Sequence, residues 1–185
     1  MKRDDLIVVR GGGDLATGVV HRLWSAGLRV LVLETAHPAA IRRQVSLCEA
    51  VYEGETAVEG MRGIRVETLA DADAIWAQNA VPVLIDPTGA CLPQARPAVL
   101  VDAIIAKKNL GTTREMAPLT IALGPGRRDF LEGRWLETEE RKAPRWNLSI
   151  HVFQEHLDFR KSRHHRGREW ARDACLMCLS SLCQE

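Results

Sequence analysis

The chain has 185 residues, of which 46% are hydrophobic and 26% are charged, which is enough to build the core of one compact domain. The net charge of +1 gives no general attraction to nucleic acid or to an anionic membrane. No apolar run approaches the ~18 residues of a membrane span, and the run that follows MKRDD is too short for a signal peptide. We therefore expect a cytoplasmic protein without nucleic-acid or membrane partners.

Short apolar runs predict the strands of a parallel sheet that is buried on both faces. These runs are Leu6–Val9, Val30–Leu33, Val83–Ile85, Val99–Ile105 and Leu119–Leu123. Between the second and third runs, Ala50–Val66 alternates in polarity and contains glycines, which favours a hairpin-like excursion, and Leu69–Asn79 is typical of a helix. Strands and helices at this spacing indicate right-handed βαβ units. The predicted fold class is α/β, a Rossmann-like, mostly parallel sheet with flanking helices.

A further helix is predicted immediately after the first strand. From Asp14 onward, Leu15, Val19 and Leu23 recur at four-residue steps, which places them on one helical face. Gly27 is well suited to end this helix, because glycine adopts the left-handed conformation that closes many helices. The first strand and this helix are therefore joined by a short glycine-rich turn.

This turn carries a pattern that is typical of dinucleotide-binding proteins. Gly11, Gly13 and Ala16 fit G-x-G-x-x-G/A between a strand and a helix, with Gly12 and Asp14 inside the pattern. The first glycine permits the tight turn, the second lets the backbone approach a pyrophosphate, and the third small residue lets helix and strand pack closely. The helix N-terminus adds free N–H groups. The alternative is a glycine-rich turn in an α/β fold that binds no ligand.

Glu34 supplies a second part of the predicted nucleotide site. It ends the second predicted strand, 23 residues after the first glycine of the turn, close to the ~20 expected for the carboxylate that binds the adenosine ribose. The two residues after it include no arginine, so NAD or another adenine nucleotide fits better than NADP. Asp14 would repel a phosphate brought close to it, and Arg10 is expected either to offset that charge or to be solvated.

Other polar residues follow the remaining strands, where ligands of doubly wound sheets bind. Asp86 follows the third apolar run, and Asp102 lies inside the fourth. Because an aspartate in an apolar strand costs several kcal/mol unless it is hydrogen-bonded, Asp102 is either a capped structural group or a site residue. Lys107 and Asn109 follow as candidate ligand-binding residues, although lysines after a strand are more often solvated. Arg42 is expected on a solvated face.

Five segments carry a resemblance to a known family. They are VVRGGGDLATGVVHRLWSAG, IRRQVSLCEAVYEGE, LIDPT, VDAIIAKKNLGT and PLTIALGPG, within about residues 5–126. They resemble the selenium-dependent molybdenum-hydroxylase accessory proteins, the YqeB family. The resemblance supports the glycines of the turn and Ala16 as the phosphate turn. It also marks a shared block without a chemical role, formed by Asp102, Lys107, Asn109, Gly111 and Thr112.

The family resemblance implies a function as well as a fold. It implies a protein that helps to mature molybdenum hydroxylases of the xanthine dehydrogenase type, with the hydroxylase as partner and the molybdenum cofactor handled as a client. A second hypothesis is an independent NAD-dependent oxidoreductase or a nucleotide-sensing module. The sequence offers no acid/base pair near a nicotinamide position, which favours the first hypothesis. No catalytic residue is assigned.

The family pattern is lost after residue 126, which predicts a domain over 1–126 and a divergent tail over 127–185. The change in composition indicates either a shifted reading frame or a genuine alternative tail. Without sustained periodicity, the tail is expected to be irregular or disordered and not to continue the sheet. Short helices are expected near Trp146–Phe159 and Trp170–Leu182. An uncovered sheet edge would then favour self-association into a homo-oligomer.

The tail also holds most of the cysteines. Cys175 and Cys178 form a Cys-x-x-Cys pair, with Cys183 after it and His164 and His165 before it. One such pair without a second does not specify zinc, so no metal site is predicted. The odd number of cysteines and their distribution also give no disulfide framework.

Overall fold

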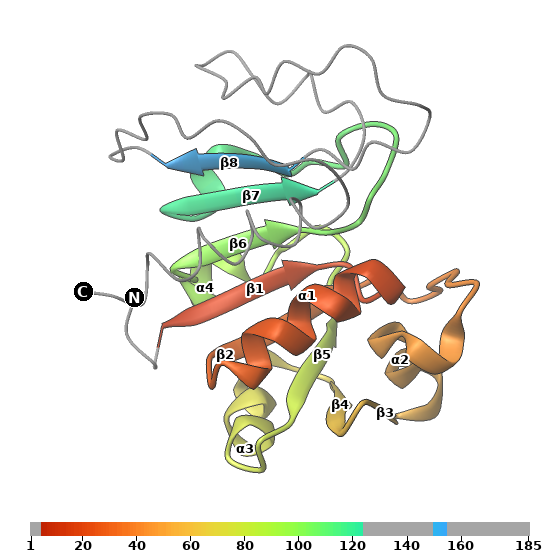
Figure 1. Ribbon diagram of the computed structural model, residues 1–185. Helices are drawn as coiled ribbons and strands as arrows, with labels where there is room; N and C mark the ends of the chain where they lie inside the picture. Colours follow the sequence, from red (N-terminus) through yellow and green to blue (C-terminus); the bar gives the residue numbers. More distant parts are fainter. Residues whose placement is uncertain (1–4, 124–149, 155–185) are drawn as a thin grey trace.

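The computed structural model describes residues 5–123 and 150–154, which form one sheet with helices packed on both of its faces (Figure 1). The strands are β1 (Leu6–Arg10), β2 (Arg29–Glu34), β3 (Glu55–Val58), β4 (Met61–Val66), β5 (Val81–Ile85), β6 (Val99–Asp102), β7 (Leu119–Leu123) and β8 (Ile150–Gln154). The α-helices are α1 (Asp14–Ser25), α2 (Ala50–Glu53), α3 (Ala72–Trp76) and α4 (Leu92–Ala95). Short 3₁₀ turns are η1 (Arg43–Val45), η2 (Leu47–Glu49), η3 (Leu69–Asp71) and η4 (Arg114–Met116).

The strands lie in the order β3-β4-β5-β2-β1-β6-β7-β8. The strands from β4 to β7 in this order are parallel to their neighbours, and β3 and β8 add antiparallel edges. The chain builds one half of the sheet from β1 through β2 to β5 and then crosses to the other side of β1 to form β6. Connections therefore leave β1 and β6 in opposite directions, which is the place where α/β sheets bind ligands. The predicted α/β fold with a mostly parallel sheet is confirmed.

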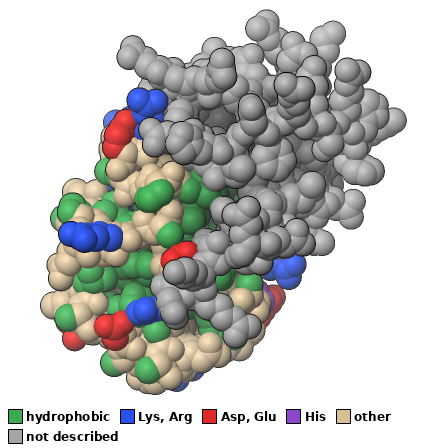
Figure 2. Space-filling view, turned by 90° about the vertical axis from the view of Figure 1, so that its left-hand side faces the viewer, with side chains coloured by type: hydrophobic (Ala, Val, Ile, Leu, Met, Phe, Trp, Pro, Cys, Tyr) green, Lys and Arg blue, Asp and Glu red, His purple; other side chains and the backbone are tan. Residues whose placement is uncertain are grey.

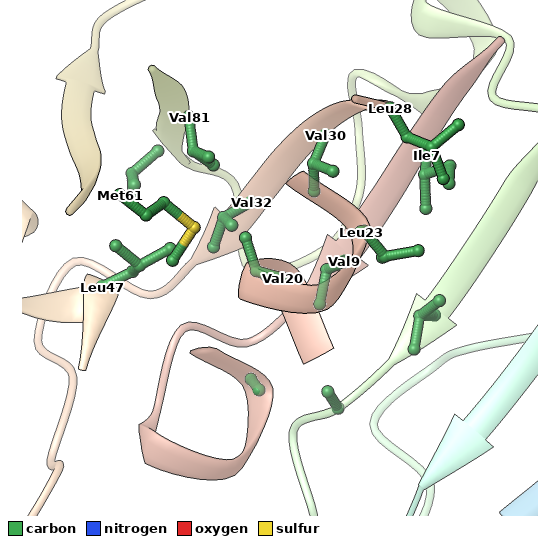
Figure 3. Packing of buried hydrophobic residues seen from close by; sticks show 14 of the residues in the cluster. Ile7, Val9, Val20, Leu23, Leu28, Val30, Val32, Leu47, Met61 and Val81 are labelled. Atoms are coloured by element: carbon green, nitrogen blue, oxygen red, sulfur yellow. The ribbon is translucent and has the colours of Figure 1, made fainter. Parts of the chain in front are cut away.

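Alternation along the central strands divides the core into two layers. Ile7 and Val9 of β1 pack on the α1 side of the sheet, whereas Val8 packs on the opposite side. Figure 3 shows Val20 and Leu23 of α1 among the residues of the first layer. Because both faces are covered, β1 and its neighbours need apolar residues at every position, and this explains why continuous runs predict them well.

The buried face of α1 differs from the prediction by one residue. The helix buries Ala16, Val20 and Leu23, whereas Leu15 is 50% exposed, so the prediction that Leu15 shares the core face is wrong. The small Ala16 lets the first turn of the helix approach the sheet, and this sets the rotation of the helix. Gly27 follows the end of the helix with φ +77°, as predicted for a glycine at this position.

Three other predicted boundaries move. The strand expected from Val83 begins at Val81, and its Pro82 lies opposite Ile64 of β4. The strand expected to reach Ile105 ends at Asp102, because Ile105 has φ +58° and cannot continue an extended strand. The helix expected over 69–79 consists of η3 and α3, while the hairpin expected within 50–66 is present as β3 and β4.

The tail contains one element that contradicts the prediction. β8 pairs antiparallel with β7, so the expectation that the tail would not continue the sheet is wrong for 150–154, and the helix expected near 146–159 is a strand there. The segment IHVFQ is rich in β-branched and aromatic residues, and β7 would otherwise present unpaired backbone groups. The helix expected near 170–182 and the cysteine and histidine cluster lie outside the described residues.

The ends at which the parallel strands begin carry apolar surface. Figure 2 looks at this end and shows hydrophobic side chains gathered there. A hollow of about 100 Å³ is lined by Trp24, Leu28, Trp76 and Val81, among others. It lies at the opposite end of the strands from the glycine turn and is not part of the candidate site. None of the described helices is long and apolar enough to cross a membrane.

Candidate functional site

The glycine turn lies at the carboxyl end of β1 and leads directly into α1 (Figure 1). Gly11 has φ +97°, and a Cβ added to it would lie 3.0 Å from the carbonyl oxygen of Ala103. A Cβ added to Gly12 would lie 3.0 Å from the backbone nitrogen of Cys48. The fold itself therefore favours glycine at both positions: at Gly11 because of its positive φ and its tight contact, and at Gly12 because of its tight contact alone.

Gly13 is different, because nothing in the described part of the chain requires it to be glycine. It is the N-cap residue of α1 with φ −67°, a value that every amino acid adopts readily. A Cβ built on it meets no atom within 4 Å. The space in front of the helix N-terminus is therefore open at the position where the dinucleotide-binding pattern needs the closest approach of a ligand.

The backbone around this open space has free donors. The first N–H groups of a helix have no partner inside the helix. Within the described residues, the Leu15 N–H donates to its neighbour's carboxylate, Asp14 Oδ1, at 2.9 Å, whereas the Gly13 and Asp14 N–H groups have no acceptor. Two unpaired N–H groups at the positive end of a 12-residue helix match the chemistry of a phosphate.

Glu34 lies beside the turn, as predicted, but its carboxylate already has two backbone partners. Oε2 accepts a hydrogen bond from the Gly12 N–H at 2.7 Å, and Oε1 accepts one from the Thr35 N–H at 2.7 Å. Each carboxylate oxygen can accept a further hydrogen bond, so a ribose hydroxyl is still compatible with this position. The structure adds a second role for Glu34, which is to hold the glycine turn in place.

The charge of Asp14 is offset by Arg42, a residue that was expected on a solvated face. Arg42 donates from Nε to Asp14 Oδ2 at 2.7 Å and forms an ion pair with the same oxygen. Arg10, which was expected to offset this charge, is 1% exposed and bonds elsewhere. Arg42 therefore places a guanidinium next to the helix N-terminus, 68% exposed and accessible to an anion.

Thr17 of α1, which was not among the residues predicted for the site, forms hydrogen bonds that hold the glycine turn in place. Its hydroxyl donates to the Gly12 carbonyl oxygen at 3.2 Å and accepts from the Leu47 N–H at 2.9 Å. The Cys48 N–H donates to the same Gly12 oxygen at 2.8 Å. A threonine on the buried face of the first helical turn was the available signal. Ala16 is also buried and packs in the core layer between α1 and the sheet, consistent with the third position of the pattern.

Asp86 accepts hydrogen bonds from the backbone of the turn that follows β5. Its carboxylate accepts backbone N–H bonds from Gly89 at 2.9 Å, Ala90 at 2.9 Å and Cys91 at 2.8 Å, as well as the Thr88 hydroxyl at 3.2 Å. Burial alone would raise the pKa of Asp86, but these donors outweigh it and hold the pKa below its ordinary value. The carboxylate is therefore ionised and engaged in shaping the loop.

The shared block around Asp102 is divided between buried and exposed residues. Asp102 is fully buried and accepts hydrogen bonds from the Thr112 hydroxyl and, at 3.1 Å, from the Ile104 N–H. Asn109 closes the loop by bonding both backbone groups of Thr112, at 2.8 and 2.9 Å. Lys107 is exposed and has no partner among the described residues. The geometry brings Asp102 into the protein interior, behind the glycine turn.

The buried thiol nearest the turn is poorly reactive. Burial raises the pKa of Cys48 to about 11, with a further contribution from the Glu34 carboxylate. A thiol with that pKa is almost fully protonated at neutral pH, which makes it a weak nucleophile there. Within the described residues, no group of His, Cys, Asp and Glu side chains is arranged to hold a metal ion.

Sequence comparison supports the resemblance to YqeB, but not the hydroxylase role that the resemblance implies. The chain is 46% identical over 121 residues, 65% of its length, to a protein of Escherichia coli (strain K12) named "Uncharacterized protein YqeB". The match covers 22% of that protein, so the chain spans about a fifth of the relative's length. No protein-family model matches the chain, and no solved structure matches it.

Proposed function

We propose that the glycine turn binds the phosphates of an adenine nucleotide, such as NAD. The observation that carries the proposal is Gly13, a glycine that neither the backbone conformation nor the packing of the described residues requires. The unpaired N–H groups of Gly13 and Asp14 would hold the phosphate, and Arg42 would add a cation at its edge. Glu34, at the end of β2, would accept a ribose hydroxyl.

We further propose that this nucleotide site belongs to an accessory protein of a molybdenum hydroxylase. Support comes from the resemblance of the shared segments to selenium-dependent accessory proteins and from the similarity to YqeB, whose printed name assigns it no activity. In this proposal the nucleotide site serves maturation of the hydroxylase, whose molybdenum cofactor is the client.

Calorimetry with NAD, ATP and AMP tests the nucleotide site. Gly13→Val puts a side chain into the open space and should abolish binding while leaving the circular dichroism spectrum unchanged. Gly18→Val is the matched control, because Gly18 lies on the same helix, is exposed and also has no atom within 4 Å of an added Cβ. Equal binding by the Gly13 variant and the parent would overturn the proposal.

A genetic experiment tests the accessory role separately. Removal of the gene should lower hydroxylase activity and the molybdenum cofactor content of the purified hydroxylase, while the amount of hydroxylase protein stays the same. Complementation with the parent chain should restore both quantities, and complementation with Gly13→Val should not. Unchanged cofactor content after gene removal would contradict the accessory role, and steady NADH oxidation with a small-molecule substrate would indicate an independent oxidoreductase.

A further inference from the structure

A cluster of buried charged and polar side chains lies behind the glycine turn, and the proposed phosphate contacts do not use it. Arg10 is 1% exposed, and Asp102 and Thr112 are fully buried. Arg10 and Asp102 end the neighbouring parallel strands β1 and β6 and face each other in the register of the sheet. The cluster therefore sits where the chain connections diverge, directly beneath the place where α/β sheets bind ligands.

The guanidinium of Arg10 joins segments that are distant in the sequence. It donates to the Thr112 hydroxyl and, at 3.3 Å, to the carbonyl oxygen of Leu110, both in the loop after β6. It also donates to the carbonyl oxygen of Pro87 at 2.7 Å, in the loop after β5. Arg10 immediately precedes the glycine turn, so one side chain ties the ends of three strands together.

The Thr112 hydroxyl is the link between the two charges. It accepts a hydrogen bond from Arg10 and donates its own proton to Asp102. A hydroxyl has one proton to donate and two lone pairs, so these two bonds fix its orientation. Asn109 fixes the backbone of the same residue from the other side, through both the N–H and the carbonyl of Thr112.

A cluster of buried charged and polar side chains contributes less to stability than apolar side chains of the same volume often would. Burying charges costs free energy that their mutual attraction only partly returns, and well-packed apolar residues of the same volume are often at least as stable. Hydrogen bonds differ from apolar contacts in that they are directional, and these bonds join named atoms of the loop to the strand ends. The carbonyl oxygen of Ala103, the first residue of this loop, lies 3.0 Å from where a Cβ of Gly11 would be. The loop and the glycine turn are thus in direct contact.

We propose that Arg10, Thr112 and Asp102 are positioning residues that hold the loop of residues 103–112 against the glycine turn. Together these two segments form the base and one wall of the nucleotide site, an assignment that rests on the function proposed above. The cluster makes no contact with the ligand. It acts by keeping the backbone N–H groups of the turn in a geometry that fits a phosphate.

Thr112→Val and Thr112→Ser test this proposal. Valine keeps the volume but leaves both buried charges without their hydroxyl partner, whereas serine keeps the hydroxyl. We expect Thr112→Val to weaken binding of NAD, ATP or AMP, whichever the parent binds, by at least about tenfold, the scale of one lost buried hydrogen bond. Amide hydrogen exchange should accelerate by a similar factor at residues 103–112 and at Gly11 and Gly12, whose N–H groups are hydrogen-bonded. Thr112→Ser should stay close to the parent in both measurements.

Val81→Ala is the control for a general loss of stability, because Val81 lies in the core at the start of β5, at the opposite end of the strands from the cluster. It should leave both readouts at the parent level. Parent-like nucleotide affinity in Thr112→Val would overturn the proposal, as would unchanged exchange at 103–112 and at Gly11 and Gly12. If the parent binds no nucleotide, the proposed function fails, and the exchange measurement by itself decides whether the cluster positions the loop.

Discussion

Alanine substitutions at Gly11 and Gly13 should differ clearly in their effect on the stability of the protein. Both glycines belong to the same turn and both match the same sequence pattern, but the structure gives them different reasons to be glycine. Gly11 has φ +97° and abuts the Ala103 carbonyl, whereas Gly13 has φ −67° and open space in front of it. Gly11→Ala therefore strains the fold, and Gly13→Ala does not.

The size of each effect follows from these two environments. A left-handed conformation costs a residue with a Cβ roughly 1–2 kcal/mol, and the contact at 3.0 Å with a backbone oxygen adds to this cost. Gly11→Ala should therefore destabilise by about 2 kcal/mol or more. Gly13→Ala reduces the freedom of the unfolded chain without strain in the folded one, a gain of about 0.4–1 kcal/mol. Alanine is a poorer N-cap residue than glycine, which offsets this gain, so Gly13→Ala should stay within about 1 kcal/mol of the parent. The two variants should therefore differ by about 2 kcal/mol.

Urea denaturation followed by circular dichroism measures the difference, and a thermal scan should place the two midpoints several degrees apart. A matched variant is Gly18→Ala, which adds a methyl group to an exposed helical position with free space around it. If Gly13→Ala destabilised the protein as much as Gly11→Ala does, Gly13 would have a structural reason to be glycine. A ligand would then not be needed to explain why position 13 is glycine.

Three other changes test the environment of the turn. Thr17→Val removes the acceptor of the buried Leu47 N–H and should destabilise by about 1–3 kcal/mol in urea melts, whereas Thr17→Ser should not. Asp86→Asn should flatten the loss of stability below about pH 5. The stability that comes from the lowered pKa of Asp86 is fully present above the unfolded-state pKa and is lost as the pH falls through the folded-state pKa, so unchanged slopes in this acid range would count against it. Cys48, with its pKa raised to about 11, should react with iodoacetamide at about pH 8 much more slowly in the folded protein than in urea, and equal rates would show an accessible thiol.

The elements that the sequence predicts well are those whose signal is local and continuous. β1 and β7 are buried on both faces, so each consists almost entirely of apolar residues and can be predicted without knowledge of its neighbours. β8 illustrates the opposite case, because a short segment becomes a strand only when an edge such as β7 is available to pair with it. The sequence also did not predict which face of α1 is buried. Leu15 and Ala16 both fit an apolar helical face, and only the packing of α1 on the sheet decides that Ala16 is buried and Leu15 exposed.

In the candidate site, too, the local features could be predicted from the sequence and the contacts between distant residues could not. The glycine turn is readable because its residues are consecutive and its physical requirements are local. The bond between Arg10 and Thr112 joins residues 102 positions apart, and no periodicity or spacing predicts which buried hydroxyl an arginine will reach. The pairing of Arg42 with Asp14 is equally non-local, since it depends on how the segment after β2 folds back over the start of α1.

Glu34 shows why a matching pattern alone does not decide whether a ligand binds. An acid at the end of the second strand is expected to hold a ribose, but here the carboxylate holds the N–H groups of Gly12 and Thr35. A protein with no ligand at this turn would have the same reason to keep Glu34, because the fold needs those two bonds. Gly11 and Gly12 are equally explained by the fold, since a Cβ would meet backbone atoms at both. Gly13 alone among the three glycines has no such explanation, and for that reason the case for a nucleotide rests on it.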